Sequence, residues 1–263
     1  MTTQSITSDQ QKQYTRFVED ASNRALKESN PDKDGLQRLF ARGGEFQAYI
    51  VAGIRRFTTS ATSNYNLART ILDKDFISPE EIMRSRHMAY TDSQLNTFDE
   101  TFPSQEVIEW CHDNNYMVVA GPNKSMSLLE IRDLKSEYLY SKTGSWYEET
   151  KETFSRNDKT DTRWIMVRKD SVPKSTGKNW DEQQALLSEI EGTPNATEVV
   201  WAVTTYKAVR GVYLLSNIHI RTSSLDSDGG RVCVGNFGRR GLSVYNDSDF
   251  SRDDSLGVSV ARK

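Results

Sequence analysis

The sequence predicts an α+β protein in which a helical N-terminal region precedes a mixed α/β region with short antiparallel strands. Two observations lead to this prediction. Within residues 1–140, apolar residues recur every three or four positions, which is the period of an amphipathic helix. Within residues 162–263, short apolar runs alternate with Gly, Asn, Asp and Ser, which is typical of strands joined by turns. Residues 141–161 are charged and nonperiodic, and we interpret them as a linker or long loop between the two regions.

Composition indicates a globular chain of one large or two small domains. The 263 residues include 34 basic and 37 acidic side chains, so net charge gives no overall attraction to nucleic acid or to an anionic membrane. No apolar run approaches the roughly 20 residues of a spanning helix. The first residues lack the basic and apolar regions of a secretory signal, so we expect a cytoplasmic protein as synthesised, which leaves a phage or surface association open. Cys111 and Cys233 are expected to be free thiols.

The first elements follow from periodicity and breaks. We expect a helix over residues 11–27, a break at 29–35, a helix over 36–57 interrupted at Gly43-Gly44, and a polar loop over 58–66. Asn30, Asp32 and Asp34 match the first half of a calcium-binding EF-hand loop. Ala41 stands where that loop requires a bidentate glutamate, so we predict a capped turn instead.

Three short helices and a strand are expected over residues 78–120. Ser78-Pro79-Glu80-Glu81 is a strong helix start, further helices begin near Thr91 and Ser104, and residues 116–120 form a buried strand. This order raises the alternative of a nucleic-acid-associated protein that uses residues 78–115. In that alternative the backbone contacts would come from Arg84, Arg86 and His87. No helix there has a dense basic face, so an ordinary helical subdomain is favoured.

The later elements are shorter and richer in turns. We expect a strand at 164–167, a helix at 182–190, and then either a helix or a strand over 198–210, which Gly211 ends. A strand at 212–220 and a turn at 226–230 should follow. Two further strands and a last strand at 256–260 complete the region.

No catalytic, metal-binding or cofactor-binding pattern is found. His87, His112 and His219 are far apart in the sequence. Cys111 and His112 are adjacent in a predicted helix, so their side chains point about 100° apart and cannot act as a catalytic dyad. Asp226 and Asp228 could ligate a cation, but a tight turn is the favoured interpretation. We therefore predict no catalytic residues, no metal and no cofactor, and an enzyme of unidentified class remains an alternative.

The stretch between the apolar runs Val232–Phe237 and Leu256–Val260 is the predicted binding face. Tyr245 and Phe250 would supply rigid apolar contacts, polar residues would supply adaptable ones, and the two arginines would form a positive rim. The predicted ligand-binding residues are Arg239, Arg240, Ser243, Tyr245, Asn246, Asp247, Asp249, Phe250, Arg252, Asp253 and Asp254.

The order of these elements resembles that of C-type-lectin-like domains. The closest resemblance is to the branch shared by formylglycine-generating-enzyme-like proteins and the variable proteins of diversity-generating retroelements. It rests on Thr197-Glu-Val-Val-Trp201, Val232–Phe237 and Arg252–Val258. Only Cys233 lies in this region, so the resemblance does not imply the activity of sulfatase-modifying enzymes, which need a cysteine pair. The calcium and sugar motifs of animal lectins are also absent.

The resemblance implies a non-enzymatic recognition protein whose partner is a protein or another macromolecule. Nucleic acid and membrane are not favoured as partners. If the chain is a variable protein, residues 236–262 form its diversified stretch. Residues 243–255 are mostly those that asparagine codons yield when adenines are substituted, although any polar surface loop is also rich in Asn, Asp and Ser.

Overall fold

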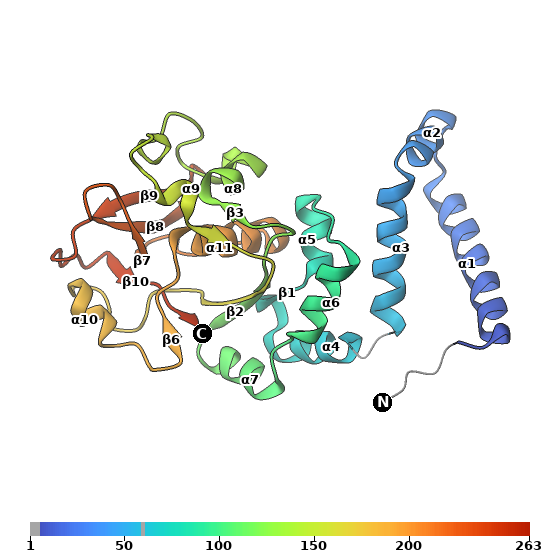
Figure 1. Ribbon diagram of the computed structural model, residues 1–263, viewed down its shortest axis with the longest axis horizontal. Coiled ribbons are helices and arrows are strands. Elements are labelled where there is room, and N and C mark those ends of the chain that lie inside the picture. The colour runs from blue at the N-terminus through green and yellow to red at the C-terminus, as the bar shows by residue number, and fades with distance from the viewer. Residues whose placement is uncertain (1–5, 59–60) are drawn as a thin grey trace. The chain divides into compact units, whose positions relative to one another are not determined.

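The computed structural model describes residues 6–58 and 61–263, and the chain divides into two compact units, Met1–Ile54 and Arg55–Lys263. Helices form the first unit, whereas the second combines helices with small sheets (Figure 1). The chain is therefore a mixed α/β protein with a helical N-terminal region, as the sequence predicts. The segment 141–161, which the sequence suggests as a linker, lies within the second unit rather than at the division.

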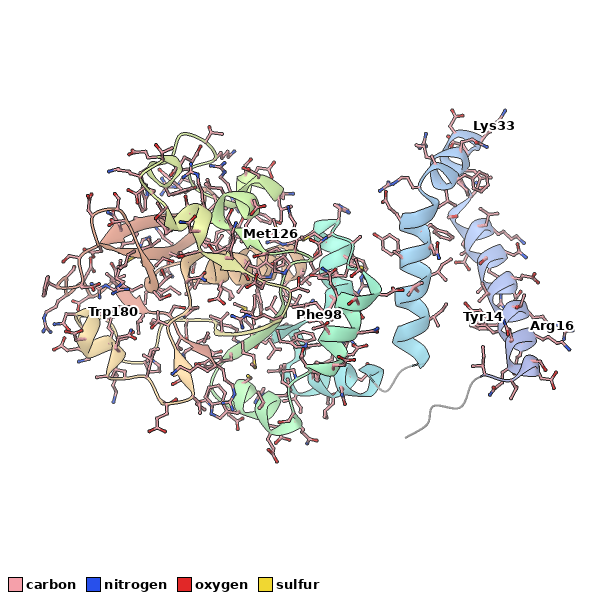
Figure 2. All side chains as sticks on the ribbon, in the orientation of Figure 1. Tyr14, Arg16, Lys33, Phe98, Met126 and Trp180 are labelled. Carbon is pink, nitrogen blue, oxygen red and sulfur yellow. The ribbon has the colours of Figure 1, made fainter. Side chains whose placement is uncertain are left out.

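The first unit contains α1 (Ser8–Ser29), α2 (Lys33–Ala41) and most of α3 (Gly43–Thr58), with the predicted breaks between them. Thr7 begins α1 with a capping box, and Asn30 ends it in a left-handed conformation. Asp32 accepts a hydrogen bond from the backbone of Gly35 at 2.6 Å, so it caps α2. Side chains of α1 point in opposite directions, as Figure 2 shows for Tyr14 and Arg16.

The first helix that lies wholly within the second unit is α4 (Ala61–Leu72), where the sequence predicts a polar loop over residues 58–66. That prediction is wrong for residues 61–66, while residues 59 and 60 lie outside the described part of the chain. Tyr65, Ala68 and Leu72 recur at helical spacing and are buried. Packing of this face stabilises a helix that its Thr- and Ser-rich start disfavours.

Five short elements follow: η1 (Asp73–Asp75), β1 (Phe76–Ile77), α5 (Pro79–Arg86), α6 (Asp92–Glu100) and α7 (Gln105–Asp113). Ser78 forms the predicted capping box with Glu81. Thr91 and Ser104 also cap the helices that follow them, so the three helix starts predicted in this region are confirmed.

A five-stranded sheet in the order β1-β2-β5-β11-β6 lies at the centre of the second unit. Its other strands are β2 (Tyr116–Ala120), β5 (Trp164–Arg168), β6 (Glu191–Gly192) and β11 (Ala261–Arg262). β2 pairs antiparallel with β5 along all five residues, which joins the chain on the two sides of segment 141–161. Trp164 packs against Phe76 and Phe102, with ring centroids 5.6 and 5.2 Å apart, and it forms part of the core.

The segment between β2 and β5 is part of the packed unit. It contains β3 (Met126–Ser127), α8 (Leu128–Leu134), η2 (Ser136–Tyr138), η3 (Trp146–Glu148), α9 (Phe154–Asn157) and β4 (Lys159–Thr160). Tyr147 and Phe154 are buried, and the Trp146 indole donates a hydrogen bond to the Val244 carbonyl at 3.0 Å. These contacts bring the segment beside the C-terminal strands.

Two helices lie in the C-terminal half, α10 (Trp180–Gln184) and α11 (Ala196–Arg210). α10 is shorter than the helix expected over residues 182–190. The stretch 198–210, which the sequence leaves open between helix and strand, is helical, and Gly211 ends it with a φ of 74°. Trp201 is buried and donates a hydrogen bond to the Ala120 carbonyl at 3.0 Å, which fixes α11 against β2.

A four-stranded sheet in the order β10-β7-β8-β9 carries the predicted binding region. Its strands are β7 (His219–Leu225), β8 (Arg231–Gly238), β9 (Gly241–Asp247) and β10 (Leu256–Val258). The strand expected over residues 212–220 is wrong for residues 212–218, where Leu215 adopts a positive φ of 54° that interrupts extended backbone. The turn expected at 226–230 is confirmed, because the Asp226 amide donates to the Gly230 carbonyl at 2.9 Å.

Candidate functional site

The predicted site residues lie at the two ends of β9 rather than in one cluster. Arg239 and Arg240 form the tip between β8 and β9, and Ser243 is close to that tip. Residues 248–254 lie beyond the other end of the strand. Seven residues of strand span about 20 Å, so the tip and this loop are separate surfaces.

The first surface is a pocket of about 350 Å³ at the hairpin tip. This tip pocket is lined by Tyr140, Asn236, Gly238, Arg239, Arg240, Gly241 and Ser243. The volume lies at the lower end of the range for ligand clefts, about 300–1,000 Å³. The structure thus brings Arg239, Arg240 and Ser243 together with two side chains, Tyr140 and Asn236, that the sequence does not point to.

An irregularity in β8 shapes this pocket. The register between β8 and β9 shifts between Gly235 and Gly238, and Asn236 has a φ of 47°. The Asn236 amide donates to the Ile218 carbonyl at 2.9 Å, and the neighbouring Phe237 is buried. The buried ring anchors the bulge, and the Asn236 side chain turns outward into the pocket.

Gly241 brings Tyr140 to the site. A Cβ on Gly241, whose φ is 106°, would lie 2.4 Å from the carbonyl carbon of Leu139, so a side chain cannot be placed there without displacing the backbone of that segment. The Tyr140 amide donates to the Leu242 carbonyl at 2.9 Å and holds the segment beside β9. A residue from about a hundred positions earlier therefore forms one wall of the pocket.

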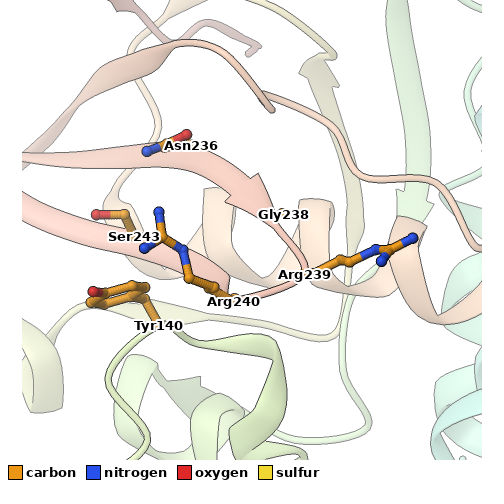
Figure 3. A pocket seen from close by; sticks show the side chains of 7 residues that line it. Tyr140, Asn236, Gly238, Arg239, Arg240 and Ser243 are labelled. Atoms are coloured by element: carbon orange, nitrogen blue, oxygen red, sulfur yellow. The ribbon is translucent and has the colours of Figure 1, made fainter.

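Arg240 gives the tip pocket its charge. Its guanidinium carbon lies 5.7 Å from the centre of the Tyr140 ring. Figure 3 shows Arg240 beside Tyr140 and Ser243, whereas Arg239 projects away on the other side of the turn. Neither arginine forms an ion pair with any residue of the described ranges 6–58 and 61–263, although several other arginines do. The pocket is therefore suited to an anionic group, which a guanidinium binds through paired hydrogen bonds.

The loop after β9 is held from below by Arg221. This side chain is completely buried, and its guanidinium donates to the carbonyls of Ser248 and Ser251 at 3.0 and 2.9 Å. It also donates to the Lys178 carbonyl at 3.1 Å and to the Gln183 amide oxygen at 2.9 Å. The loop is thus a supported surface, as a binding face requires. Arg221 is not among the predicted site residues, because an arginine in a strand carries no sign of its burial in the sequence.

Several predicted site residues make bonds within the chain. Asp249 accepts two hydrogen bonds from Arg231 at 3.0 and 3.1 Å, and Arg252 forms an ion pair with Glu182 at 2.6 Å. Three further side chains accept or donate locally: Asn246 donates to Asp226, Asp247 accepts from the backbone of Ser248, and Asp253 accepts from the backbone of Ser255. Phe250 is 86% exposed, and Asp254 is also exposed.

Tyr245 lies half-buried against His219, with ring centroids 4.5 Å apart. His219 is also half-buried, and its buried Nε2 atom has no hydrogen-bond partner among the described residues. Burial lowers the pKa of His219, because it disfavours the charged imidazolium. The neutral ring therefore serves as a packing surface for Tyr245.

Other reactive side chains are arranged for structure. Burial raises the pKa of both cysteine thiols, Cys111 and Cys233, to about 12, so neither is a thiolate nucleophile near neutral pH. Asp226 accepts hydrogen bonds from the backbone amides of Asp228 and Gly230 at 2.9 and 2.7 Å, as a tight turn requires. A search of the described residues finds no group of three acidic, histidine or cysteine side chains placed to hold a metal ion.

Arg86, one of the three residues suggested as nucleic-acid contacts in the helices over residues 78–115, contacts another part of the chain. The Arg86 guanidinium donates to the Thr204 hydroxyl at 2.6 Å and lies 4.6 Å from the Trp201 ring centre. Arg84 and His87 remain exposed.

Comparisons with known proteins find no family model, no curated protein and no solved structure that matches this chain. Among the described helices, none combines the length and the apolar character needed to cross a membrane. The arrangement of the site itself is therefore the basis for a functional conclusion.

Proposed function

We propose that this chain is a non-enzymatic recognition protein whose tip pocket binds an acidic group of a protein partner. The observation that carries the proposal is Arg240, whose guanidinium lines the pocket beside Tyr140 and has no ion-pair partner among the described residues. A carboxylate of the partner would accept hydrogen bonds from Arg240 and from the Ser243 hydroxyl. The Tyr140 ring would pack against the aliphatic part of the partner side chain that carries this carboxylate.

Phe250 provides a second, apolar contact for the same partner. Its ring is 86% exposed, and Arg221 holds the loop on both sides of it. Exposed aromatic residues on a rigid support are frequent energetic centres of protein interfaces. A charged contact at the tip and an aromatic contact about 20 Å away would fit a protein surface better than a small molecule.

The proposed class of domain is the C-type-lectin-like one. From residue 164 on, the elements follow in the order β5, α10, β6, α11, β7, β8, β9, β10 and β11, and the resemblance rests on this order without the short strand β6. If residues 236–262 are diversified, the positions free to vary are those without bonds that support the fold. On this proposal they include Arg239, Arg240, Ser243, Phe250 and Asp254, whereas Asp249 is tied to Arg231. A reverse transcriptase gene beside this gene would support the diversification.

A binding assay with a defined acidic polymer tests the proposal. Fluorescence anisotropy of labelled poly-L-glutamate, titrated with the full chain, measures the interaction. We expect Arg240→Ala to weaken binding about tenfold, because a hydrogen bond to a charged group contributes about 1.5 kcal/mol or more. Arg239→Ala should have a smaller effect, because Arg239 lines only the edge of the pocket and its side chain extends away from Tyr140 and Ser243 (Figure 3).

Arg84→Ala is the matched control, because Arg84 is an exposed residue of α5 that does not line the tip pocket and that serves the nucleic-acid alternative. Equal loss of polyglutamate binding in all three variants would contradict the proposal, since it would show attraction by general positive charge. Tight binding of duplex DNA at about 50 mM salt that is lost in Arg84→Ala would favour the nucleic-acid alternative instead.

A further inference from the structure

The polar side chains that line the tip pocket make no hydrogen bond and no ion pair with any residue of the ranges 6–58 and 61–263, which the structure describes. In the loop after β9, by contrast, Asp249 is bonded to Arg231 and Asp253 to the backbone of Ser255. The polar groups of the pocket therefore serve no bond of the fold and are available to a ligand. They belong to Tyr140, Asn236, Arg239, Arg240 and Ser243.

The charge of the tip pocket is positive and is not balanced within its lining. Arg239 and Arg240 line the pocket, and none of its lining residues is an aspartate, a glutamate or a histidine. Arg240 lies beside Tyr140 and Ser243, whereas Arg239 extends from the edge of the pocket (Figure 3). A ligand group with two negative charges therefore matches the pocket more closely than a single carboxylate does.

The donors of the tip pocket also exceed what a carboxylate can use. A guanidinium presents its N–H groups as a planar fork that pairs with two oxygens of one ligand. Arg240 and Ser243 together can satisfy both oxygens of a carboxylate, which leaves the Asn236 amide group without an oxygen of its own. A phosphate monoester has a third terminal oxygen and about two negative charges near pH 7. The additional oxygen and the additional charge correspond to Asn236 and to the second arginine.

We propose that the acidic group bound by the tip pocket is a phosphate monoester on a phosphorylated side chain of the protein partner. This inference rests on the proposed function, because it names the ligand of the same pocket. Two oxygens of the phosphate pair with the Arg240 guanidinium, and the third accepts hydrogen bonds from Asn236 and Ser243. Tyr140 packs against the aliphatic part of the phosphorylated side chain, and Arg239 adds positive charge at the edge.

Three forms of one short peptide test the choice between phosphate and carboxylate. The peptide is otherwise uncharged and carries phosphoserine, glutamate or serine at its centre. Fluorescence anisotropy of the rhodamine-labelled peptide, titrated with the full chain, measures each dissociation constant. We expect the phosphoserine form to bind at least about tenfold more tightly than the glutamate form, because one further hydrogen bond to a charged group corresponds to about that factor. The serine form, which lacks the negative charge, should not bind measurably.

The pH dependence of binding separates the two anions independently. A phosphate monoester has a second pKa of about 6, so it loses one negative charge as the pH falls from about 7.5 to about 5.5. A glutamate side chain keeps its charge over this range. None of the residues that line the pocket is of a type that titrates there, so the change belongs to the ligand. Acidification should therefore weaken binding of the phosphoserine form several-fold and leave binding of the glutamate form constant.

Asn236→Gly tests the contact with the third oxygen. Glycine readily adopts the left-handed conformation of this position, where φ is 47°, so the bulge is retained while the amide donor is lost. We expect about tenfold weaker binding of the phosphoserine form and a much smaller loss for the glutamate form, whose oxygens are satisfied by Arg240 and Ser243. Asn30→Gly is the matched control, because Asn30 also has a positive φ, of 40°, and does not line the tip pocket. It should leave both affinities unchanged.

Adenosine monophosphate identifies the source of the phosphate, because it carries the same monoester on a nucleoside. We expect it to displace the labelled phosphoserine peptide less effectively than the unlabelled peptide does. The polar side chains of the pocket are occupied by the phosphate, so none remains to bind the edge of the base. Displacement by adenosine monophosphate at equal or lower concentration would indicate a nucleotide pocket and overturn the assignment to a phosphorylated partner.

The remaining outcomes separate this inference from the proposed function. Equal affinity for the phosphoserine and glutamate forms would overturn the inference and leave the proposed function intact. The same holds if the affinity for the phosphoserine form does not change with pH, or if Asn236→Gly affects both forms alike. If neither charged form binds, or if Arg240→Ala leaves both affinities unchanged, the proposed function fails together with this inference.

Discussion

Replacing the buried Arg221 with methionine tests how the loop after β9 is held. The guanidinium makes four hydrogen bonds of 2.9–3.1 Å to uncharged acceptors. Bonds from a charged donor contribute about 1.5 kcal/mol each, or about 6 kcal/mol together. Removing the arginine also removes the cost of burying its charge, which is several kcal/mol. We therefore expect Arg221→Met to lower the free energy of unfolding by about 3 kcal/mol.

Urea denaturation followed by tryptophan fluorescence measures this change. With a slope of about 2 kcal/mol per molar urea, the midpoint should fall by about 1.5 M. Hydrogen exchange should also accelerate in residues 248–255, because their backbone loses its anchor. Arg252→Met is the matched control, since Arg252 is 53% exposed and its ion pair with Glu182 contributes less than about 1 kcal/mol. A loss below about 1 kcal/mol for Arg221→Met, with exchange in the loop unchanged, would refute this account.

Three further predictions concern the site and its surroundings. Gly241→Ala should destabilise the chain by about 1–3 kcal/mol and weaken polyglutamate binding, because its Cβ would collide with the segment that carries Tyr140. Cys111 and Cys233 should react with a thiol reagent only at the rate of unfolding, as burial raises both thiol pKa values to about 12; fast labelling of the native chain would contradict this. Since burial lowers the pKa of His219 below its ordinary value of 6.5, the unfolded chain binds this proton more readily. The free energy of unfolding should therefore fall as the pH drops below 6.5, and it should fall less in the His219→Gln variant. Urea titrations at several pH values measure this difference.

Local signals predict the helices well. The capping residues Thr91 and Ser104 mark the starts of α6 and α7, and Gly211 marks the end of α11, because each acts on backbone groups a few residues away. The loop predicted for residues 61–66 is wrong because the structure of this stretch depends on distant contacts rather than on local ones. It becomes helical through the burial of Tyr65 and the residues that follow it, which is a tertiary effect.

The site could be predicted only in part. Arg239, Arg240 and Ser243 are close in sequence and meet in the tip pocket. Tyr140 reaches the same pocket through a backbone contact with Gly241, and no local pattern reveals a contact over that separation. Likewise, the sequence cannot show that Asp249 is bound to Arg231, because composition does not distinguish a side chain facing solvent from one that supports the fold.

The way in which Arg221 holds the loop has a consequence for its evolution. The guanidinium contacts the main-chain oxygens of positions 248 and 251 and makes no hydrogen bond to the side chains there. Every amino acid offers the same carbonyl, so the anchorage is indifferent to which side chains those positions carry. The tip of this loop can therefore acquire new residues while its attachment to the sheet is retained.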